Sequence, residues 1–176
     1  FSAELAGRGF SEVHAFEPSP STFAKLQDNM ETNVSTRGVV KLNNVAVGPT
    51  VGHVDFQAEP ESPATSHVRL AGAEEPPLAA AQRVPMVTLD QYCEEAKLGQ
   101  VDFLKIDTEG LEPFVLDGAR EAIRRLRIPL IHLELCPPLL QRAGTSVGEL
   151  YDRILSLGYE VRALSPLGEP GPAMAL

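Results

Sequence analysis

The sequence predicts an α/β fold in which a parallel, doubly wound sheet is covered by helices on both faces. Short apolar runs alternate with helix-like segments along the chain, as in folds of this class. Two of the runs, "VDFLKID" (101–107) and "LIHLEL" (130–135), are almost continuously apolar. Such strands are typical of parallel sheets that are buried on both faces. A chain of 176 residues, 43% hydrophobic, is long enough for one globular domain.

The first half of the chain supplies three further expected strands. They are "EVHAF" (12–16), "VVKLNNVAV" (39–47) and, as an edge strand, "GHVDFQ" (52–57). Between the first two, Ser19 is expected to cap a helix that has Pro20 at its first position, where proline is well tolerated.

Two capping boxes and one long apolar stripe predict the helices of the second half. Thr88 with Gln91 opens one helix, and Ser146 with Glu149 opens another. Between them a single helix is expected, with one apolar stripe formed by Leu111, Phe114, Val115, Ala122, Ile123 and Leu126. "YEVRAL" (159–164) is expected to be the last strand.

These elements predict one domain over residues 1–164, followed by a flexible tail, 165–176. Residues 58–82 are rich in Pro, Ala and Glu and show no period, so we expect a long surface excursion there. An excursion of this length could act as a lid over a bound ligand.

Charge and composition exclude several classes of partner. A net charge of −9 argues against a nucleic acid partner and against an anionic membrane surface, because both attract basic proteins. No apolar run approaches the roughly 20 residues of a membrane-spanning helix, so we expect no membrane insertion. Cys93 and Cys136 lack metal-ligand spacing and are expected to be reduced thiols, which predicts a cytoplasmic protein.

Acidic and amide side chains follow the expected strands. Ligands of open α/β sheets lie beyond the carboxyl ends of the parallel strands. The first strand ends at Glu17, the second near Asn44 and Ala46, and the two most apolar strands end at Asp107 and Glu134. We therefore expect three carboxylates and one amide along one rim of the sheet.

Each of these residues also has a structural interpretation. Glu17 could bind a ribose or be a solvated acid, and Asp107 could be functional or a helix cap. Glu109 and Glu112 could be first-turn acids of a helix, and His132 is more typical of a packed core histidine than of a ligand.

A divalent-cation site is a further alternative for three of the acids. Asp107, Glu109 and Glu134 carry oxygen ligands of the kind that Ca²⁺ and Mg²⁺ prefer, but their spacing matches no strong motif. We therefore predict no metal.

The chain closely resembles the FkbM family of S-adenosylmethionine-dependent methyltransferases, through motifs that run in order from Val13 to Leu135. These motifs are "VHAFEPSP", "LQDNMETN", "NNVAVG", "TLDQY", "VDFLKIDTEGLEPFVLDGA" and "IHLEL". The resemblance implies a class I methyltransferase (Rossmann-like) fold and methyl transfer from S-adenosylmethionine, usually to an oxygen of a small-molecule, sugar or lipid acceptor.

The resemblance also implies roles for individual residues. Glu17 would bind the cofactor ribose, and Asn44 and Ala46 would lie near the adenine. Asp107 would lie by the methionine end of the cofactor, and Glu109 and Glu134 would face the acceptor. The candidates for a general base are Asp107, Glu109, His132 and Glu134, and the sequence favours Asp107 or Glu109.

The family pattern includes a first strand and a glycine-rich turn that this sequence does not show. Phe1 falls within the helix that should follow the turn, and Gly7 and Gly9 come at the end of that helix. We therefore expect the sequence to be part of a longer chain.

Because the sequence does not show the glycine-rich turn, two other functions are considered. A binding or regulatory module that has lost its cofactor site is the main alternative to an enzyme. A nicotinamide-dependent oxidoreductase is less favoured, because it needs the same turn and the sequence has no Tyr-x-x-x-Lys-like pair.

Overall fold

The computed structural model describes residues 1–33, 38–57, 67–69, 82–166 and 168–174. The chain divides into two compact units. The first comprises Phe1–Val47 and Val51–Val87, and the second comprises Gly48–Thr50 and Thr88–Leu176. None of the helices in the described part of the chain has the length and hydropathy needed to cross a membrane.

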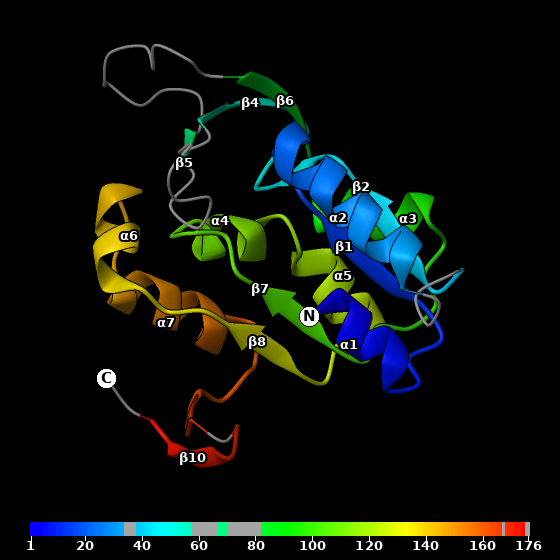
Figure 1. Cartoon of the computed structure of the whole chain (residues 1–176). Helices are drawn as coiled ribbons and strands as arrows, with labels where there is room; N and C mark the ends of the chain where they lie inside the picture. The colour runs from blue at the N-terminus through cyan, green and yellow to red at the C-terminus, as the bar shows by residue number, and fades with distance from the viewer. Residues whose placement is uncertain (34–37, 58–66, 70–81, 167, 175–176) are drawn as a thin grey trace. The chain divides into compact units, whose positions relative to one another are not determined.

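A parallel strand pair forms the centre of the first unit (Figure 1). β1 (Val13–Phe16) pairs with β2 (Val40–Asn43) from Val13↔Val40 to Phe16↔Asn43. α1 (Ser2–Gly7) precedes β1, and α2 (Pro20–Thr32) connects the two strands.

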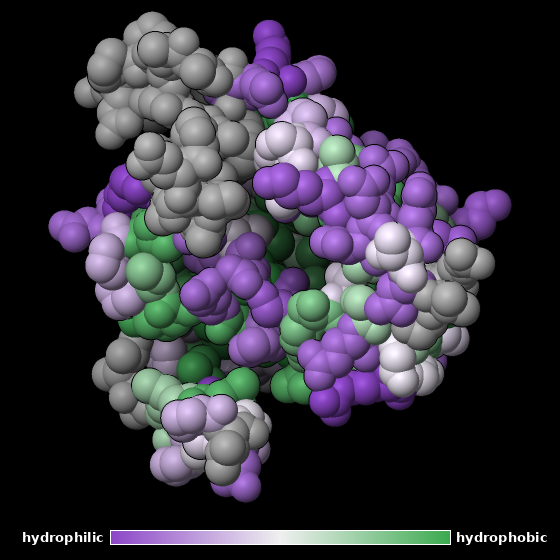
Figure 2. Space-filling view, viewed as in Figure 1, coloured by the Kyte–Doolittle hydropathy of each residue, from purple (hydrophilic) through white to green (hydrophobic). Residues whose placement is uncertain are grey.

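The predicted start of α2 is confirmed. Ser19 is buried, and its Oγ accepts a hydrogen bond from the backbone N–H of Thr22 at 3.3 Å, while Pro20 is the first helical residue. The apolar residues Phe23, Leu26 and Met30 are half-buried. Figure 2 shows the opposite, mostly hydrophilic face of α2.

The prediction of one strand over 39–47 is wrong. The segment divides into β2 and β3 (Ala46–Val47), because β2 pairs with β1 whereas β3 pairs with β6 (Gln82–Val87). β3 therefore belongs to a different sheet, with the order β3-β6-β4-β5. Its other strands are β4 (Gly52–Gln57) and β5 (His67–Arg69), and its core consists of Ala46, Val54, Val84 and Met86.

The expected excursion at 58–82 contains ordered strand. β5 lies within it and pairs antiparallel with β4, and Gln82 is already the first residue of β6. Residues 58–66 and 70–81, with the lid predicted for them, lie outside the described residues.

The second unit also contains a parallel pair. β7 (Leu104–Ile106) pairs with β8 (Ile131–Leu133) from Leu104↔Ile131 to Ile106↔Leu133 (Figure 1). The predicted sheet is thus present as separate pairs: within the described strands, β1 has only β2 as a neighbour and β7 has only β8. The helices of this unit are α3 (Leu89–Glu95), α4 (Glu112–Asp117), α5 (Arg120–Leu126), α6 (Pro137–Arg142) and α7 (Val147–Ser156).

The C-terminal segment differs from the expected loose tail. β9 (Arg162–Leu164) is shorter than the predicted strand 159–164, and it pairs antiparallel with β10 (Pro170–Ala173). Cys93 and Cys136 form no disulfide, as expected.

The prediction of a single helix after β7 is also wrong, because α4 and α5 are separated at Gly118 and Ala119. A Cβ on Gly118 would lie 2.1 Å from the carbonyl oxygen of Gly48, so only glycine fits at this position. The Gly118 carbonyl accepts from the backbone N–H of Asp90 at 2.9 Å. The Asp90 carboxylate then accepts from Ala122 N at 2.6 Å, in the first turn of α5.

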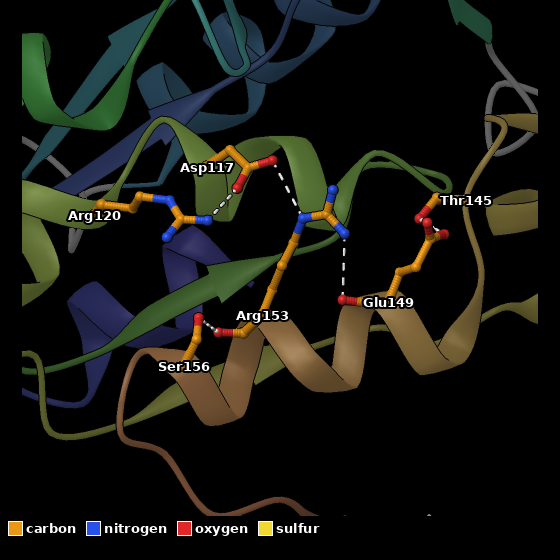
Figure 3. Close-up of polar contacts among 6 residues, drawn as sticks. All are labelled: Asp117, Arg120, Thr145, Glu149, Arg153 and Ser156. Atoms are coloured by element: carbon orange, nitrogen blue, oxygen red, sulfur yellow. Dashed lines mark hydrogen bonds and ion pairs between the residues drawn. The ribbon is translucent and has the colours of Figure 1, made fainter.

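An acid–base network connects α4, α5 and α7 (Figure 3). The Asp117 carboxylate accepts from Arg120 at 2.7 Å and from Arg153 Nε at 3.2 Å. Arg153 also donates to the carbonyl oxygen of Glu149 at 3.2 Å, and Ser146 caps α7 as predicted. Asp117 thereby holds the two helices that follow β7 against α7.

We expect Gly118→Ala to lower the free energy of unfolding by about 1–3 kcal/mol, the usual cost of overpacking a tight contact. The reason is the 2.1 Å approach of the added Cβ to a backbone oxygen that a rotamer change cannot move. The measurement is urea unfolding of the full-length protein. The control is Gly148→Ala in α7, where the nearest atom to the new Cβ is 3.9 Å away. Equal midpoints for the two variants would contradict this explanation of the helix break.

Candidate functional site

Glu17 follows β1 directly and is half-buried. Its backbone N–H donates to the Asn43 carbonyl at 3.0 Å, which extends the pairing of β1 with β2 by one residue. Its carboxylate oxygen Oε1 accepts from Ser19 N at 2.8 Å. Partial burial raises the pKa of the Glu17 carboxyl, and the hydrogen bond from Ser19 opposes that rise. Glu17 is therefore a fixed carboxylate at a strand end.

The structure brings Asn44 to Glu17, as the strand order predicts. The Asn44 side-chain amide donates to the Glu17 carbonyl at 2.8 Å and to the Pro18 carbonyl at 3.3 Å. The side-chain nitrogen is thus used to join the ends of two strands. Ala46 is different: it is 4% exposed and packs in the core of its sheet, so any ligand contact would involve its backbone.

Three carboxylates meet at one end of the β7–β8 pair. Asp107 follows β7, Glu134 follows β8, and Glu134 N donates to the Ile106 carbonyl at 3.1 Å, which keeps the two strand ends level. One carboxylate oxygen from each of Asp107, Glu109 and Glu134 lies within 4.8 Å of the other two. These residues are named below as the acid cluster.

Asp107 does not cap a helix. α4 begins at Glu112, preceded by Leu111, and has no side-chain cap. The Asp107 carboxylate instead contacts the Lys105 ammonium and hydrogen-bonds with Glu134. The cap interpretation is therefore wrong, because α4 begins five residues after Asp107 and its N-cap position is Leu111.

The Asp107–Glu134 hydrogen bond separates the two pKa values. Two neighbouring carboxylates disfavour double ionisation, so one proton is shared between them. The hydrogen bond, assisted by Lys105, lowers the pKa of Asp107. The same bond and the negative charge of Asp107 raise the pKa of Glu134 to about 7. Near neutral pH the pair therefore holds one negative charge on Asp107 and a proton on Glu134 that is easily lost.

Glu109 completes the cluster from a tight turn. Its φ is 55°, and the next residue, Gly110, has φ 99°. A Cβ on Gly110 would lie 2.5 Å from the Leu139 carbonyl oxygen, so both the backbone angle and the space require glycine. Partial burial raises the pKa of Glu109, and the charges of Asp107 and Glu112 add to the rise, while Arg142 opposes it.

The chemistry of this donor set fits proton transfer better than metal binding. The cluster has the oxygen ligands of a hard cation. However, the Lys105 ammonium already contacts Asp107, and the negative charge of Asp107 raises the pKa of Glu134 to about 7, so that Glu134 gains and loses a proton near neutral pH. His132 is half-buried and its ring stacks on Phe103, with 6.5 Å between ring centroids, so the packed interpretation fits it better than that of a ligand.

Sequence comparison decides the family. The Methyltransferase FkbM domain matches residues 2–161. The chain belongs to the FkbM methyltransferase family. The resemblance in the sequence motifs is thereby confirmed, and a methyltransferase is confirmed as the enzyme class of the family.

Two characterised relatives are similar along much of the chain. The 2-O-methyltransferase NoeI of Sinorhizobium fredii is 23% identical over 93% of this chain and 69% of its own length. The hexuronic acid methyltransferase AglP of Haloferax volcanii is 23% identical over 70% of this chain, which spans about half (47%) of AglP.

A solved structure shows the fold. The crystal structure of methyltransferase FkbM from Methylobacillus flagellatus KT superposes with a TM-score of 0.52 and 20% identity. The match covers 88% of this chain and 33% of that chain. The predicted class I methyltransferase-like fold is therefore confirmed.

Proposed function

We propose that the protein transfers a methyl group from S-adenosylmethionine to a hydroxyl oxygen of a small-molecule acceptor, with Glu134 as the general base. The observation that carries the proposal is the Asp107–Glu134 pair, in which one carboxyl has a pKa of about 7. A base of this pKa is half deprotonated at neutral pH and matched to proton transfer there.

Each unit, taken by itself, has residues that fit part of a bound S-adenosylmethionine, which would supply an electrophilic methyl group on a sulfonium and leave as a neutral sulfide. Glu17 can accept hydrogen bonds from the two ribose hydroxyls, because it is fixed at a strand end and Ser19 N holds only one of its oxygens. Asn44 and the backbone of Ala46 would lie near the adenine.

Asp107 would bind the ammonium of the methionine end. Its contact with the Lys105 ammonium supports this role, since the carboxylate already accepts a partner of that chemistry. Its lowered pKa keeps it charged near neutral pH.

Glu134 takes the proton of the acceptor hydroxyl onto a carboxylate oxygen as that hydroxyl oxygen forms its new bond to carbon. Asp107 stabilises the protonated Glu134 by accepting its hydrogen bond. Glu109 lies close enough to bind a neighbouring hydroxyl of the acceptor. The sequence favoured Asp107 or Glu109 as the base, whereas Glu134 is proposed here because its neighbour Asp107 raises its pKa to about 7.

The acceptor we propose is a sugar. The relative AglP is a hexuronic acid methyltransferase, which supports this class, and NoeI is a 2-O-methyltransferase, which supports transfer to oxygen. Clustered carboxylates suit it, because adjacent sugar hydroxyls are hydrogen-bond donors. The net charge of −9 supports an enzyme with no nucleic acid partner, and the two free thiols, Cys93 and Cys136, support a cytoplasmic location.

We expect Glu134→Gln to lower kcat by about 10²-fold or more in the full-length protein, because the amide cannot accept a proton. In the wild type, kcat should rise with pH through about 7 and then level off, since deprotonated Glu134 is the active form. Methyl transfer to a panel of sugars from labelled S-adenosylmethionine is the measurement.

The control for this variant is Asp102→Asn, which alters an exposed acid before β7 whose partner is Gln100. Its turnover and pH profile should match the wild type. An unchanged pH profile in Glu134→Gln would exclude Glu134 as the base.

We expect Glu17→Ala to weaken S-adenosylmethionine binding by about 1.5–3 kcal/mol, the range for hydrogen bonds to a charged group. Calorimetry on the full-length protein measures this loss. Glu31→Ala, at an exposed position of α2, is the control and should bind normally. Equal affinities for wild type and Glu17→Ala would remove Glu17 from the cofactor site.

A further inference from the structure

Glu112 is a buried carboxylate beside the acid cluster. It is the first residue of α4 and only 2% exposed, although glutamate is rarely buried without a partner. Its Oε1 accepts three hydrogen bonds, from Thr108 N at 2.9 Å, Thr108 Oγ1 at 3.1 Å and Gly110 N at 3.2 Å. Its Oε2 is buried too and has no hydrogen-bond partner within the described residues.

Burying the Glu112 carboxylate in this way lowers the stability of the fold, so a role in stability alone does not explain it. A buried carboxylate is normally compensated by a cation, and no ion pair involves Glu112 in the part of the chain that the structure describes. An unpaired buried oxygen adds a desolvation cost. A first-turn acid at the surface of α4 would interact with the helix dipole without either cost.

The three hydrogen bonds hold an unfavourable turn. The residues that donate them, Thr108 and Gly110, lie on either side of Glu109, which has a φ of 55°. A left-handed backbone at a residue other than glycine costs of order 1–3 kcal/mol and persists only where the surroundings enforce it. The Glu112 carboxylate stabilises this backbone conformation by accepting the three hydrogen bonds of the turn.

The turn decides where Glu109 points. With this backbone conformation, a carboxylate oxygen of Glu109 lies within 4.8 Å of Asp107 and Glu134. Asp107 and desolvation make the largest contributions to the raised pKa of Glu134, and the charge of Glu109 raises it further. The charge of Lys105 lowers the pKa of Glu134. The charge of Glu112 raises the pKa of Glu109, and the charge of Arg142 in α6 lowers it.

We propose that Glu112 is a positioning residue, which holds the Thr108–Gly110 turn so that Glu109 faces the Asp107–Glu134 pair and the acceptor hydroxyls. The inference rests on the proposed function for its catalytic meaning. Its structural part, a turn held by one carboxylate, can be measured without methyl transfer.

Glu112→Ala and Glu112→Gln, in the full-length protein, separate positioning from general stability. Alanine removes the oxygen that accepts from Thr108 N and Gly110 N, so backbone amide exchange at these two residues should become at least 10-fold faster. The NMR titration midpoint of Glu134 should move to lower pH, because Glu109 no longer faces it. Glutamine keeps an acceptor at Oε1 and displaces no donor at Oε2. It should therefore retain slow exchange, the Glu134 midpoint and most of kcat.

The matched control is Glu149→Ala. Glu149 is also an acid in the first turn of a helix, and it accepts from Thr145 at 3.0 Å (Figure 3). It also accepts from Ser146 at 3.1 Å and is not part of the acid cluster. Its loss should lower the unfolding midpoint and leave the Glu134 titration unchanged.

Wild-type exchange at Thr108 and Gly110 as fast as in an unstructured peptide would overturn the proposal, even if Glu112→Ala does not fold. So would a folded Glu112→Ala protein with an unchanged Glu134 midpoint. Slow exchange in the wild type and a shifted Glu134 midpoint in Glu112→Ala, with no methyl transfer by the wild type, would refute the proposed function and leave the held turn in place.

Discussion

The parallel pairing of β7 with β8 is the constraint on which the chemistry of the second unit depends. Because the two strands run in the same direction and end level, the residues that follow them, Asp107 and Glu134, meet at one end. Two carboxylates at hydrogen-bond distance cannot both be charged at low cost. Strand pairing thus creates a shared proton: the interaction with Glu134, and after it Lys105, lowers the pKa of Asp107, whereas Asp107 raises the pKa of Glu134.

The remaining features of the second unit fix this strand end and what surrounds it. Gly110 lets the turn after β7 pass against Leu139, and Glu112 binds that turn from inside. Gly118 lets α4 end against Gly48, and Asp117 ties the end of α4 to α7. In the family motif "DTEGLEPFVLDGA", each glycine therefore permits a close backbone approach, and Asp107, Glu112 and Asp117 each have different hydrogen-bond partners.

Strand ends could be predicted from the sequence because they depend on local order. Apolar runs followed by Glu17, Asp107 and Glu134 predict carboxylates at strand ends wherever the strands are parallel. The start of α2 was predictable for a similar reason, since Ser19 caps it through its own neighbour, Thr22. The motifs also indicated the family directly.

Features that depend on distant residues could not be predicted. The helix break at Gly118 is set by Gly48, and the break after Asn43 is set by the pairing of β3 with β6. Glu112 is a first-turn acid of α4, as one interpretation of the sequence had it, but its burial is not visible in the sequence. The one available signal was its spacing, four residues after Thr108 with a glycine between them.

The central claim is that Asp107 and Glu134 share a proton, and ¹³C NMR titration of the Glu134 carboxyl in the full-length protein tests it most directly. We expect a midpoint of about 7 in the wild type. The midpoint should move toward the ordinary glutamate range in Asp107→Asn and stay unchanged in Asp102→Asn. A wild-type midpoint in the ordinary range that does not respond to Asp107→Asn would contradict the account.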